Sequence, residues 1–318
     1  MKAAVRSRYG PPAVLTVQEV TTPAPKDDEV LIRVHAASVN RSDYHVLTGS
    51  PWPMRCFTGL IRPTLASTGT DFAGRIESTG PKVSKFKAGE NVMGFGGVFG
   101  IGSHAQYLAL SERGGIVPMP ASITYVQAAA CLEGAYYAAT ALTQVKPRAG
   151  QKALVYGATG AIGSAYVQLL KCSDVYVTAV CADEHRHLMM SLGADKVVDY
   201  RTQDFTRDTE RYDLIVDAVG KTSYVACRKL MQNDGVYTSS GGFENLFLAV
   251  ATRLVGRKRV LFIGPTDIVG NLMLIKDLVE QGRFKPVIDR QYPIEKISEA
   301  FAYVGTGQKI GNVIVTMD

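Results

Sequence analysis

The sequence predicts an α/β protein built from a β-rich domain and a doubly wound parallel sheet. Three observations support this fold class. The first ~120 residues contain short apolar, β-branched runs separated by Pro and Gly, which is typical of a β-rich domain. From Tyr125 onward, strand-like runs alternate with helix-like segments, which indicates a parallel sheet covered by helices. Between two of these runs lies a glycine-rich turn at 157–163 that places a helix directly after a buried strand.

The glycine-rich turn is the most informative motif of the chain. An apolar run ends in Gly157, Gly160 and Gly163, and a helix-like segment and a second apolar run follow. In this order, backbone N–H groups at a helix N-terminus bind the pyrophosphate of a dinucleotide. We expect Gly160 to let the backbone approach the phosphates and Gly163 to let the helix pack on the strand. Because Ala158 replaces the usual first glycine, the alternative is an ordinary tight turn, which does not explain the position between two buried strands.

The individual elements follow from hydrophobic periodicity and turn residues. In the β-rich part we expect strands at Val14–Val20, Val30–Val34, Ala73–Ser78, Asn91–Gly94 and Ala105–Leu110, and a loop at Trp52–Thr68. An alanine-rich helix is expected at Ala128–Val145. The parallel strands are then expected at Ala153–Tyr156, Val175–Val180, Lys196–Asp199, Leu214–Ala218, Val236–Ser239 and Val260–Ile263. After a helix that ends near Gly282, the tail returns to a strand–helix–strand pattern that we expect to fold back onto the β-rich part.

The composition is that of a globular protein with a sizeable core. Hydrophobic residues make up 46% and charged residues 20% of the 318 residues, and the formal net charge is +6. The basic residues are scattered, apart from one tight cluster of Arg253, Arg257, Lys258 and Arg259, with which no aromatic residues interleave. The sequence therefore favours a mildly basic surface that attracts anionic cofactors over nucleic-acid binding.

Cysteine usage and hydropathy indicate the compartment. The five cysteines, Cys56, Cys131, Cys172, Cys181 and Cys227, are far apart and form no Cys-x-x-Cys pair, which favours free thiols in a reducing compartment. No apolar h-region follows the N-terminal residues, and no apolar stretch approaches the ~18 residues that span a bilayer. We therefore expect a soluble cytoplasmic protein without a membrane partner.

Several further motifs agree with one family. They are Tyr9-Gly-Pro-Pro12, the segment 28–40, Gly69-Thr-Asp-Phe-Ala-Gly74, the segment 191–200, Phe284-Lys-Pro-Val-Ile-Asp-Arg290 and Gly311-Asn-Val-Ile-Val315. In their order and spacing they resemble the medium-chain dehydrogenase/reductase superfamily, and within it the quinone oxidoreductase-like branch. The resemblance implies a GroES-like catalytic domain formed by 1–123 and 285–318, and a Rossmann cofactor-binding domain at 124–284. It also implies an active site in the cleft between these domains.

The residues at the family's zinc positions decide the subfamily. Zinc-dependent alcohol dehydrogenases of this superfamily use a Cys, a His-Glu pair and a later Cys. The corresponding positions here are 40–43, Thr70-Asp71 and approximately Glu133, and the family's structural zinc lobe is missing. Because zinc prefers thiolate or imidazole ligands, carboxylates alone make a poor zinc site. We therefore expect no zinc.

The expected chemistry follows from the missing Lewis acid. Alcohol oxidation would lack its usual means of stabilising an alkoxide, whereas reduction of a quinone or an activated C=C bond needs only a hydride, hydrogen bonds and a proton. The resemblance points to the same substrates, quinones and α,β-unsaturated carbonyl compounds. The alternatives are a cofactor-binding, redox-sensing or interaction protein without significant turnover, and a zinc-dependent alcohol dehydrogenase.

Candidate catalytic residues come from two of the matched segments. The resemblance places Asn40 and Asp43 near the nicotinamide, where they would orient the ribose or a water; the alternative is a helix N-cap by Ser42 or Asp43. Tyr44 and His45 are donors for a developing oxyanion, or simply packing residues. Thr70 and Asp71 replace the zinc-binding pair and are expected to hydrogen-bond within the cleft or to satisfy backbone groups.

The cofactor is expected to contact residues along the whole Rossmann domain. The pyrophosphate would contact Thr159, Gly160, Ala161, Ile162 and Gly163, and the adenosine end would contact Tyr200. The nicotinamide ribose would contact Ser240, Gly241 and Gly242. Further contacts would come from Phe262 and Ile263 on the next strand, and from Gly311 and Asn312 in the C-terminal tail. These assignments follow the family resemblance.

The preference for NADP or NAD depends on the end of the second Rossmann strand. That end, Val180-Cys181-Ala182, is neutral and permits a 2′-phosphate, which His185 and Arg186 would bind. Asp183 and Glu184 in the same loop oppose this, because an acid that points at the ribose would favour NAD. We expect NADPH to be preferred over NADH. We also expect a homodimer, because family members commonly pair their Rossmann sheets, here through 237–247 and 260–263.

Overall fold

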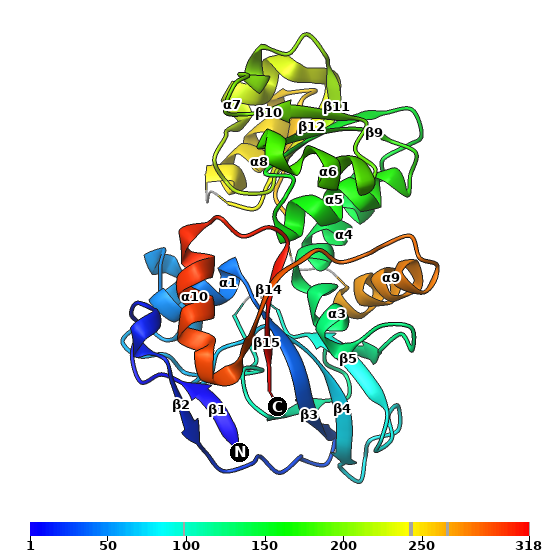
Figure 1. Cartoon of the computed structure of the whole chain (residues 1–318). Helices are drawn as coiled ribbons and strands as arrows, with labels where there is room; N and C mark the ends of the chain where they lie inside the picture. The colour runs from blue at the N-terminus through cyan, green and yellow to red at the C-terminus, as the bar shows by residue number, and fades with distance from the viewer. Residues whose placement is uncertain (98, 242–243, 265–266, 318) are drawn as a thin grey trace. The chain divides into compact units, whose positions relative to one another are not determined.

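The computed structural model describes residues 1–97, 99–241, 244–264 and 267–317 and contains two compact units (Figure 1). Unit 1 comprises Met1–Glu133, Ile268–Glu280 and Lys285–Asp318, and unit 2 comprises Gly134–Asp267 and Gln281–Phe284. The predicted domains, 1–123 with 285–318 and 124–284, therefore differ from the units at their boundaries. The reason is that α3 (Tyr125–Ala130) and α9 (Ile268–Glu280) both pack on strands of unit 1.

The central strand of unit 1 is β3 (Glu29–Val39). It pairs antiparallel with β4 (Asp71–Thr79) on one side, and with β6 (Tyr107–Ser111) and β15 (Asn312–Thr316) on the other. The sheet continues from β4 to β5 (Asn91–Phe95) and β7 (Ile116–Pro118), and from β15 to β14 (Ile288–Pro293), while β1 (Lys2–Val5) and β2 (Thr16–Glu19) form a separate hairpin. The predicted return of the tail to the β-rich part is confirmed: red β15 lies beside blue β3 in Figure 1.

Hydrophobic periodicity explains the core of unit 1. Along the first half of β3, Val30, Ile32 and Val34 are buried on alternate positions, as expected of a strand with one face on the core. The helix α10 (Ile297–Thr306) buries Ile297, Ala300, Phe301 and Val304, a spacing that gives one apolar helix face. These residues belong to one hydrophobic cluster.

Unit 2 contains the predicted doubly wound parallel sheet. Its strand order is β10 (Lys196–Asp199), β9 (Tyr176–Cys181), β8 (Lys152–Tyr156), β11 (Tyr212–Asp217), β12 (Met231–Ser239) and β13 (Arg259–Leu261), with every neighbouring pair parallel. The helices between the strands are α5 (Ala161–Lys171), α6 (Arg186–Ser191), α7 (Tyr224–Cys227) and α8 (Glu244–Val255); α4 (Glu133–Val145) precedes β8. The strand order reverses between β8 and β11, and ligands of such sheets bind at the carboxyl ends near this point.

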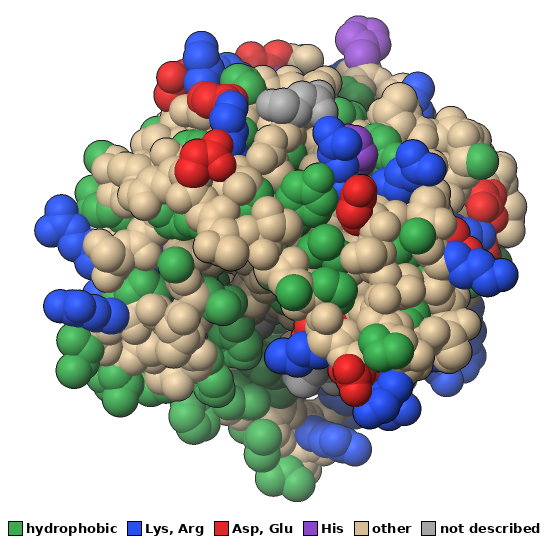
Figure 2. Space-filling view, turned by 90° about the horizontal axis from the view of Figure 1, so that it is seen from below, with side chains coloured by type: hydrophobic (Ala, Val, Ile, Leu, Met, Phe, Trp, Pro, Cys, Tyr) green, Lys and Arg blue, Asp and Glu red, His purple; other side chains and the backbone are tan. Residues whose placement is uncertain are grey.

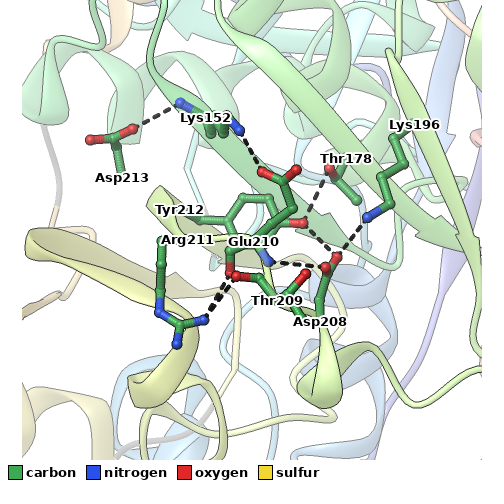
Figure 3. Close-up of polar contacts among 9 residues, drawn as sticks. All are labelled: Lys152, Thr178, Lys196, Asp208, Thr209, Glu210, Arg211, Tyr212 and Asp213. Carbon is green, nitrogen blue, oxygen red and sulfur yellow. Dashed lines mark hydrogen bonds and ion pairs between the residues drawn. The ribbon is translucent and has the colours of Figure 1, made fainter.

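The opposite edge of this sheet, at the amino ends of the strands, is held by a polar network (Figure 3). The Asp208 carboxylate accepts hydrogen bonds from Lys196 Nζ at 2.8 Å and from the Tyr212 hydroxyl at 2.9 Å. Lys152 forms an ion pair with Glu210, and its backbone N–H donates to the Asp213 carboxylate at 2.8 Å. The network therefore anchors the segment between β10 and β11 on the amino edge.

Three predicted elements need correction. The predicted helix Ala128–Val145 consists of two helices, α3 and α4, because the N–H of Glu133 bonds to the Asp71 carboxylate instead of continuing a helix. The predicted loop Trp52–Thr68 contains a 3₁₀ turn, Trp52–Met54, and the short helix α2 (Arg55–Thr58). β13 ends at Leu261, so Phe262 and Ile263 follow the strand rather than lie in it.

The surface carries charges of both signs. On the face shown in Figure 2, Lys and Arg side chains are spread among acidic and hydrophobic ones. This distribution agrees with the scattered basic residues of the sequence. Among the helices of the described residues, none has the length and apolar character needed to cross a bilayer.

Candidate active site

The candidate site of unit 1 forms where β3 ends and α1 (Arg41–Thr48) begins. Asn40 caps this helix: its Oδ1 accepts from the backbone N–H of Asp43 at 2.8 Å, and Asp43 Oδ2 accepts from the N–H of Asn40 at 3.1 Å. The capping box confirms that this polar pair serves a helix N-terminus. The N-cap is Asn40, however, and not Ser42 or Asp43, because only Asn40 keeps an extended backbone before the helix.

Asn40 also links the helix start to the residues at the zinc positions. Its Nδ2 donates to Thr70 Oγ1 at 2.8 Å and to Ser38 Oγ at 3.3 Å. The Asp71 carboxylate accepts the Ser38 N–H at 2.7 Å and the Ser38 hydroxyl at 2.6 Å. All four residues are almost completely buried. The structure therefore brings Asn40, Asp43, Thr70 and Asp71 together in unit 1, and most of their polar atoms are used within the network itself.

Burial controls the protonation of the acids in this network. Burial raises the pKa of Asp71 to about 6, against the hydrogen bonds from Ser38 and from the Glu133 backbone that lower it. Burial also raises the pKa of Asp43 well above its usual range, and the neighbouring Asp71 and Glu133 raise it further. Among the described residues, Asp43 Oδ1 is one of the few buried side-chain atoms without a hydrogen-bond partner. Because an unpartnered buried carboxylate oxygen is costly, a neutral Asp43 fits this position better than an ionised one.

Glu133 and Lys309 extend the network. The Ser42 hydroxyl donates to Glu133 Oε1 at 2.6 Å. Burial raises the pKa of Glu133 to about 7, against the lowering effects of Ser42 and Lys309. Burial lowers the pKa of the Lys309 ammonium, and the Glu133 charge opposes this shift. Lys309 Nζ donates to the carbonyl of Gly311 at 2.6 Å. Glu133 and Lys309 are therefore groups that can hold or release a proton near neutral pH, and Ser42 is hydrogen-bonded to Glu133.

Ser38, Lys309 and His104 also take part in this network, and none of them was predicted as a site residue. Ser42 was predicted only as a helix N-cap, and Glu133 was named only at a zinc position. His104 Nε2 bonds to the Ser38 carbonyl at 2.9 Å, and its Nδ1 bonds to Thr68 Oγ1 at 2.8 Å. Burial lowers the pKa of His104 to about 4, so the imidazole is neutral at physiological pH. Because a carbonyl oxygen can only accept a hydrogen bond, Nε2 is the ring nitrogen that carries the proton.

Tyr44 and His45 lie outside the hydrogen-bond network around Asp71. The Tyr44 ring packs against Gly305 of α10 and against the hydrophobic core of unit 1, as the packing alternative predicts. His45 is half-buried, and burial lowers the pKa of its imidazole, against a hydrogen bond with the Ser50 backbone. The direct catalytic roles predicted for these two side chains therefore receive no support from their contacts.

A separate candidate site, in unit 2, is the glycine-rich turn between β8 and α5. A Cβ on Gly163 would lie 2.2 Å from the Gly157 carbonyl oxygen and 2.7 Å from Ala158 Cα, which explains why this position requires glycine. A Cβ on Gly160 would meet nothing closer than 3.7 Å. Gly160 is the N-cap of α5, and the N–H of Ser164 donates to its carbonyl at 2.8 Å. The N–H groups of Ala161, Ile162 and Gly163 lie in the first turn of α5, where backbone N–H groups have no partner within the helix. Such groups can bind a pyrophosphate, and the predicted contacts of these residues with the cofactor stay a prediction.

Two further segments lie beside this turn. Asp217, at the carboxyl end of β11, accepts hydrogen bonds from the N–H groups of Val219, Gly220 and Thr222 at 2.8–3.1 Å and so fixes the loop after the strand. A Cβ on Gly157 would lie 2.5 Å from Val219, and the N–H of Ser240 donates to the Asp217 carbonyl at 2.9 Å. Ser240 and Gly241 therefore lie at the carboxyl edge of the sheet, as predicted; Gly242 is outside the described residues. The sequence analysis missed Asp217, although an acid at a strand end is a signal for such a loop.

The predicted adenosine end carries two ion pairs. Arg186 Nε donates to Asp183 Oδ1 at 2.7 Å, and Arg201 donates to Glu184 at 3.1 Å. The acids that oppose NADPH binding are therefore already paired with arginines, and Arg201 is a basic residue that the sequence analysis missed. Its guanidinium carbon lies 6.0 Å from the Tyr200 ring centroid, and half of Tyr200 is exposed.

The remaining predicted cofactor residues are distributed over both units. Cys181 is buried at the end of β9, and burial raises the pKa of its thiol to about 11. Its side chain is therefore a neutral packing group. Gly311 and Asn312 belong to unit 1, where Asn312 Nδ2 donates to the Val287 carbonyl at 3.0 Å. Their predicted contact with the cofactor stays a prediction.

The donor set of unit 1 does not fit a zinc ion. Both oxygens of Asp71 accept hydrogen bonds from Ser38, and Thr70 Oγ1 accepts from Asn40. Binding a metal here would break these bonds and would still supply no thiolate or imidazole. Within the described residues, no group of His, Cys, Asp or Glu has the arrangement of a metal site.

Comparisons with known proteins cover the whole chain. An alcohol dehydrogenase GroES-like domain matches residues 26–121, and a zinc-binding dehydrogenase domain matches residues 192–315. The chloroplastic NADPH-dependent alkenal/one oxidoreductase of Arabidopsis thaliana is 30% identical and covers 99% of this chain and 79% of its own length. A chloroplastic quinone-oxidoreductase of Triphysaria versicolor is 29% identical over 99% of this chain and 98% of its own length.

The fold agrees with these relatives. The solved quinone oxidoreductase structure from Coxiella burnetii has a TM-score of 0.89, covers 100% of this chain and 99% of its own, and is 24% identical. Both domain matches occur in the order that the sequence motifs predict, and the relatives align over nearly the full chain. The chain is thus an oxidoreductase that belongs to the medium-chain dehydrogenase/reductase superfamily, in its quinone oxidoreductase-like branch.

Proposed function

We propose that the chain is a zinc-independent, NADPH-dependent reductase of quinones or α,β-unsaturated carbonyl compounds. One observation carries the proposal: the positions that hold zinc in related dehydrogenases form a closed hydrogen-bond network around Asp71. Such a network offers hydrogen bonds and protons but no Lewis acid. The names of the relatives, quinone and alkenal/one oxidoreductases, support the same substrate classes.

The chemistry requires a hydride, a site for the resulting anion and a proton. The bound nicotinamide supplies the hydride from its C4 atom. The chain supplies the proton: Ser42 donates to Glu133 at 2.6 Å, and the Glu133 carboxyl has a pKa of about 7. At neutral pH, part of the Glu133 population is protonated. The Glu133 carboxyl would give its proton to Ser42 Oγ while the Ser42 hydroxyl gives its own proton to the product anion, which leaves Glu133 as a carboxylate. We therefore assign proton delivery to the Ser42–Glu133 pair, with Lys309 tuning the charge of Glu133.

The preference for NADPH rests on two arginines, Arg186 after β9 and Arg201 after β10. Arg186 and Arg201 are held by Asp183 and Glu184, and a guanidinium can exchange a carboxylate for the 2′-phosphate without losing its charged partner. NADH has no such group, so its binding would leave both ion pairs unchanged. This argument favours NADPH, as does the neutral end of the strand.

The first experiment measures cofactor oxidation by the metal-stripped protein, with NADPH and NADH compared and an ortho-quinone and a short enone as acceptors. We expect turnover with NADPH and no stimulation by added zinc. Activity that appears only after zinc is restored would replace the proposal with an alcohol dehydrogenase. Tight NADPH binding without turnover on either acceptor would instead favour a redox-sensing or interaction protein.

We also propose that the chain forms a homodimer through unit 2. β13 is the last strand of its sheet, and α8 exposes Leu246, Phe247, Val250 and Leu254. An edge strand beside exposed apolar side chains is a surface that proteins commonly cover by association. Light scattering combined with size-exclusion chromatography tests this, and a monomer at micromolar concentration would contradict it.

A further inference from the structure

Unit 2 contains a basic hollow that the proposed reaction does not use. The hollow has a volume of about 650 Å³ and is lined by Thr206, Val225, Ala226, Arg228, Lys229 and Lys258. Half of the lining residues are cationic and none is acidic. The sequence cluster 253–259 contributes only Lys258, so the fold itself brings this lysine together with Arg228 and Lys229.

The hollow lies at the amino edge of the sheet. Its residues belong to segments that lead into neighbouring strands: Thr206 precedes β11, Arg228 and Lys229 precede β12, and Lys258 precedes β13. The glycine-rich turn follows the carboxyl end of β8, which runs parallel to β11. Because β11 has six residues, the two edges are separated by about 20 Å. The hollow is therefore distinct from the dinucleotide turn.

Hydrogen bonds hold the walls of the hollow in place. Lys258 Nζ donates to the Arg228 carbonyl at 2.9 Å, and the Tyr224 hydroxyl donates to the Lys258 carbonyl at 3.2 Å. On the other side, Asp204 Oδ1 accepts the N–H of Thr206 at 3.0 Å and its hydroxyl at 2.6 Å. The network of Figure 3 anchors the following residues, from Asp208 to Asp213, on the sheet. These bonds fix the backbone of the walls and the Lys258 side chain, whereas the side chains of Arg228 and Lys229 are exposed.

The charges around the hollow favour an anion. Asp204 is an acid that interacts with Lys229, and its carboxylate already binds Thr206 and Arg207. Arg228 and Lys229 are exposed, and the apolar side chain of Val225 is 76% exposed. The hollow thus offers cationic groups for phosphates and an apolar wall for an organic part. Its volume is within the range of small-molecule sites, ~300–1,000 Å³.

We propose that this hollow is a second anion site, which binds a phosphorylated small molecule of about mononucleotide size. The assignment rests on the geometry of unit 2 alone and is independent of the proposed reaction. Arg228 and Lys229 would contact the phosphates, and Val225 would pack against the organic part. Lys258 holds one wall and adds positive charge.

The test uses ATP and inorganic tripolyphosphate as probes, titrated calorimetrically into the full chain at saturating NADPH. We expect both to bind, with ATP binding more tightly, and we expect Lys229→Ala to weaken ATP binding about tenfold, because it removes one hydrogen bond to a charged group. Arg253→Ala is the matched control: it removes a positive charge from the sequence cluster but none from the hollow. Val225→Ser should weaken ATP binding and leave tripolyphosphate binding unchanged.

A footprinting measurement places the ligand directly. ATP should protect Lys229 and Lys258 from acetylation and leave the exposed Lys221 reactive. Equal losses for Lys229→Ala and Arg253→Ala, or no binding of either probe, would overturn the proposal. Equal affinities for ATP and tripolyphosphate would overturn the role of Val225. A single-stranded oligonucleotide that binds more tightly than ATP and loses affinity in Lys229→Ala would replace the small molecule with a nucleic acid.

Discussion

Ser38 donates both its backbone N–H and its hydroxyl to the Asp71 carboxylate, at 2.7 Å and 2.6 Å. The same residue accepts a hydrogen bond from His104 through its carbonyl, at 2.9 Å. Ser38 therefore joins an acid with a raised pKa to a histidine with a lowered one in the interior of unit 1. Burial is the main cause of both shifts, and the Ser38 hydrogen bonds oppose each of them: they lower the pKa of Asp71 and raise the pKa of His104.

Removing the Ser38 hydroxyl should destabilise the chain in a pH-dependent way. Asp71 ionises above a pKa of about 6, so Ser38→Ala deprives a charged carboxylate of a donor only at higher pH. We expect a loss of about 1.5–3 kcal/mol at alkaline pH and about 1 kcal/mol in acid, where the partner is neutral. Urea unfolding at both pH values measures the difference, and Ser78→Ala on β4 serves as a control. An identical loss at both pH values would contradict a titrating Asp71.

His104 should stay neutral in the folded chain. Its pKa is lowered to about 4, whereas an unfolded histidine titrates near ~6.5. The folded state therefore binds fewer protons than the unfolded one in this window. The contribution of the neutral His104 to the free energy of unfolding is present above pH ~6.5 and is lost as the pH falls toward 4. ¹⁵N chemical shifts of the histidine ring should show one neutral tautomer, protonated at Nε2, down to about pH 5. A folded-state midpoint near 6.5 would disprove this.

Glu133→Gln tests the proposed proton delivery. Activity of the unaltered chain should fall as the pH rises through about 7, because the protonated carboxyl is lost. The variant should lose about 10- to 100-fold in kcat together with this pH dependence, while NADPH affinity is retained. Glu77→Gln, at an exposed position of β4, is the control. A kcat profile that keeps its break in Glu133→Gln would assign the proton to another group.

The glycine-rich turn allows a comparison of two neighbouring alanine substitutions. Gly163→Ala places a methyl group 2.2 Å from the Gly157 carbonyl oxygen, so we expect a stability loss of several kcal/mol. Gly160→Ala meets no protein atom within 3.7 Å and should leave the unfolding free energy nearly unchanged. Its methyl group would occupy the space next to the pyrophosphate, so cofactor affinity should fall. Thermal unfolding and NADPH titration measure both effects; normal NADPH affinity in Gly160→Ala would place the pyrophosphate elsewhere.

Arg186→Ala should weaken NADPH binding about tenfold and leave NADH binding unchanged, because only NADPH has the 2′-phosphate. Arg201→Ala should have the same selectivity if both guanidinium groups bind the phosphate. Fluorescence titration with both cofactors checks this. If Arg186→Ala weakened NADPH and NADH equally, the phosphate assignment would be wrong.

The sequence predicted the parts of the fold that depend on periodicity and turn residues. Buried strands such as β8 and the glycine positions of the turn have local patterns, and both were placed correctly. The network around Asp71 was predicted only in part: Ser38 lies within the matched segment 28–40, but neither it nor Lys309 was given a role there. A single polar residue within a buried strand gives no signal of its partner on another strand. Tyr44 was considered as a catalytic donor because it follows Asp43 in the sequence. The sequence does not show that the helix face carrying Tyr44 packs on α10.

Strand β15 has a consequence for how the chain is synthesised. It covers the edge of β3 at residues 36–39, yet the whole of 134–267 lies between the two strands in the sequence. On the ribosome, unit 2 can complete its sheet while β3 still lacks this partner and presents open backbone groups. Exposed strand edges in partly folded chains promote association with other chains. The edge of β3 at residues 36–39 therefore stays open to such association until β15 has emerged.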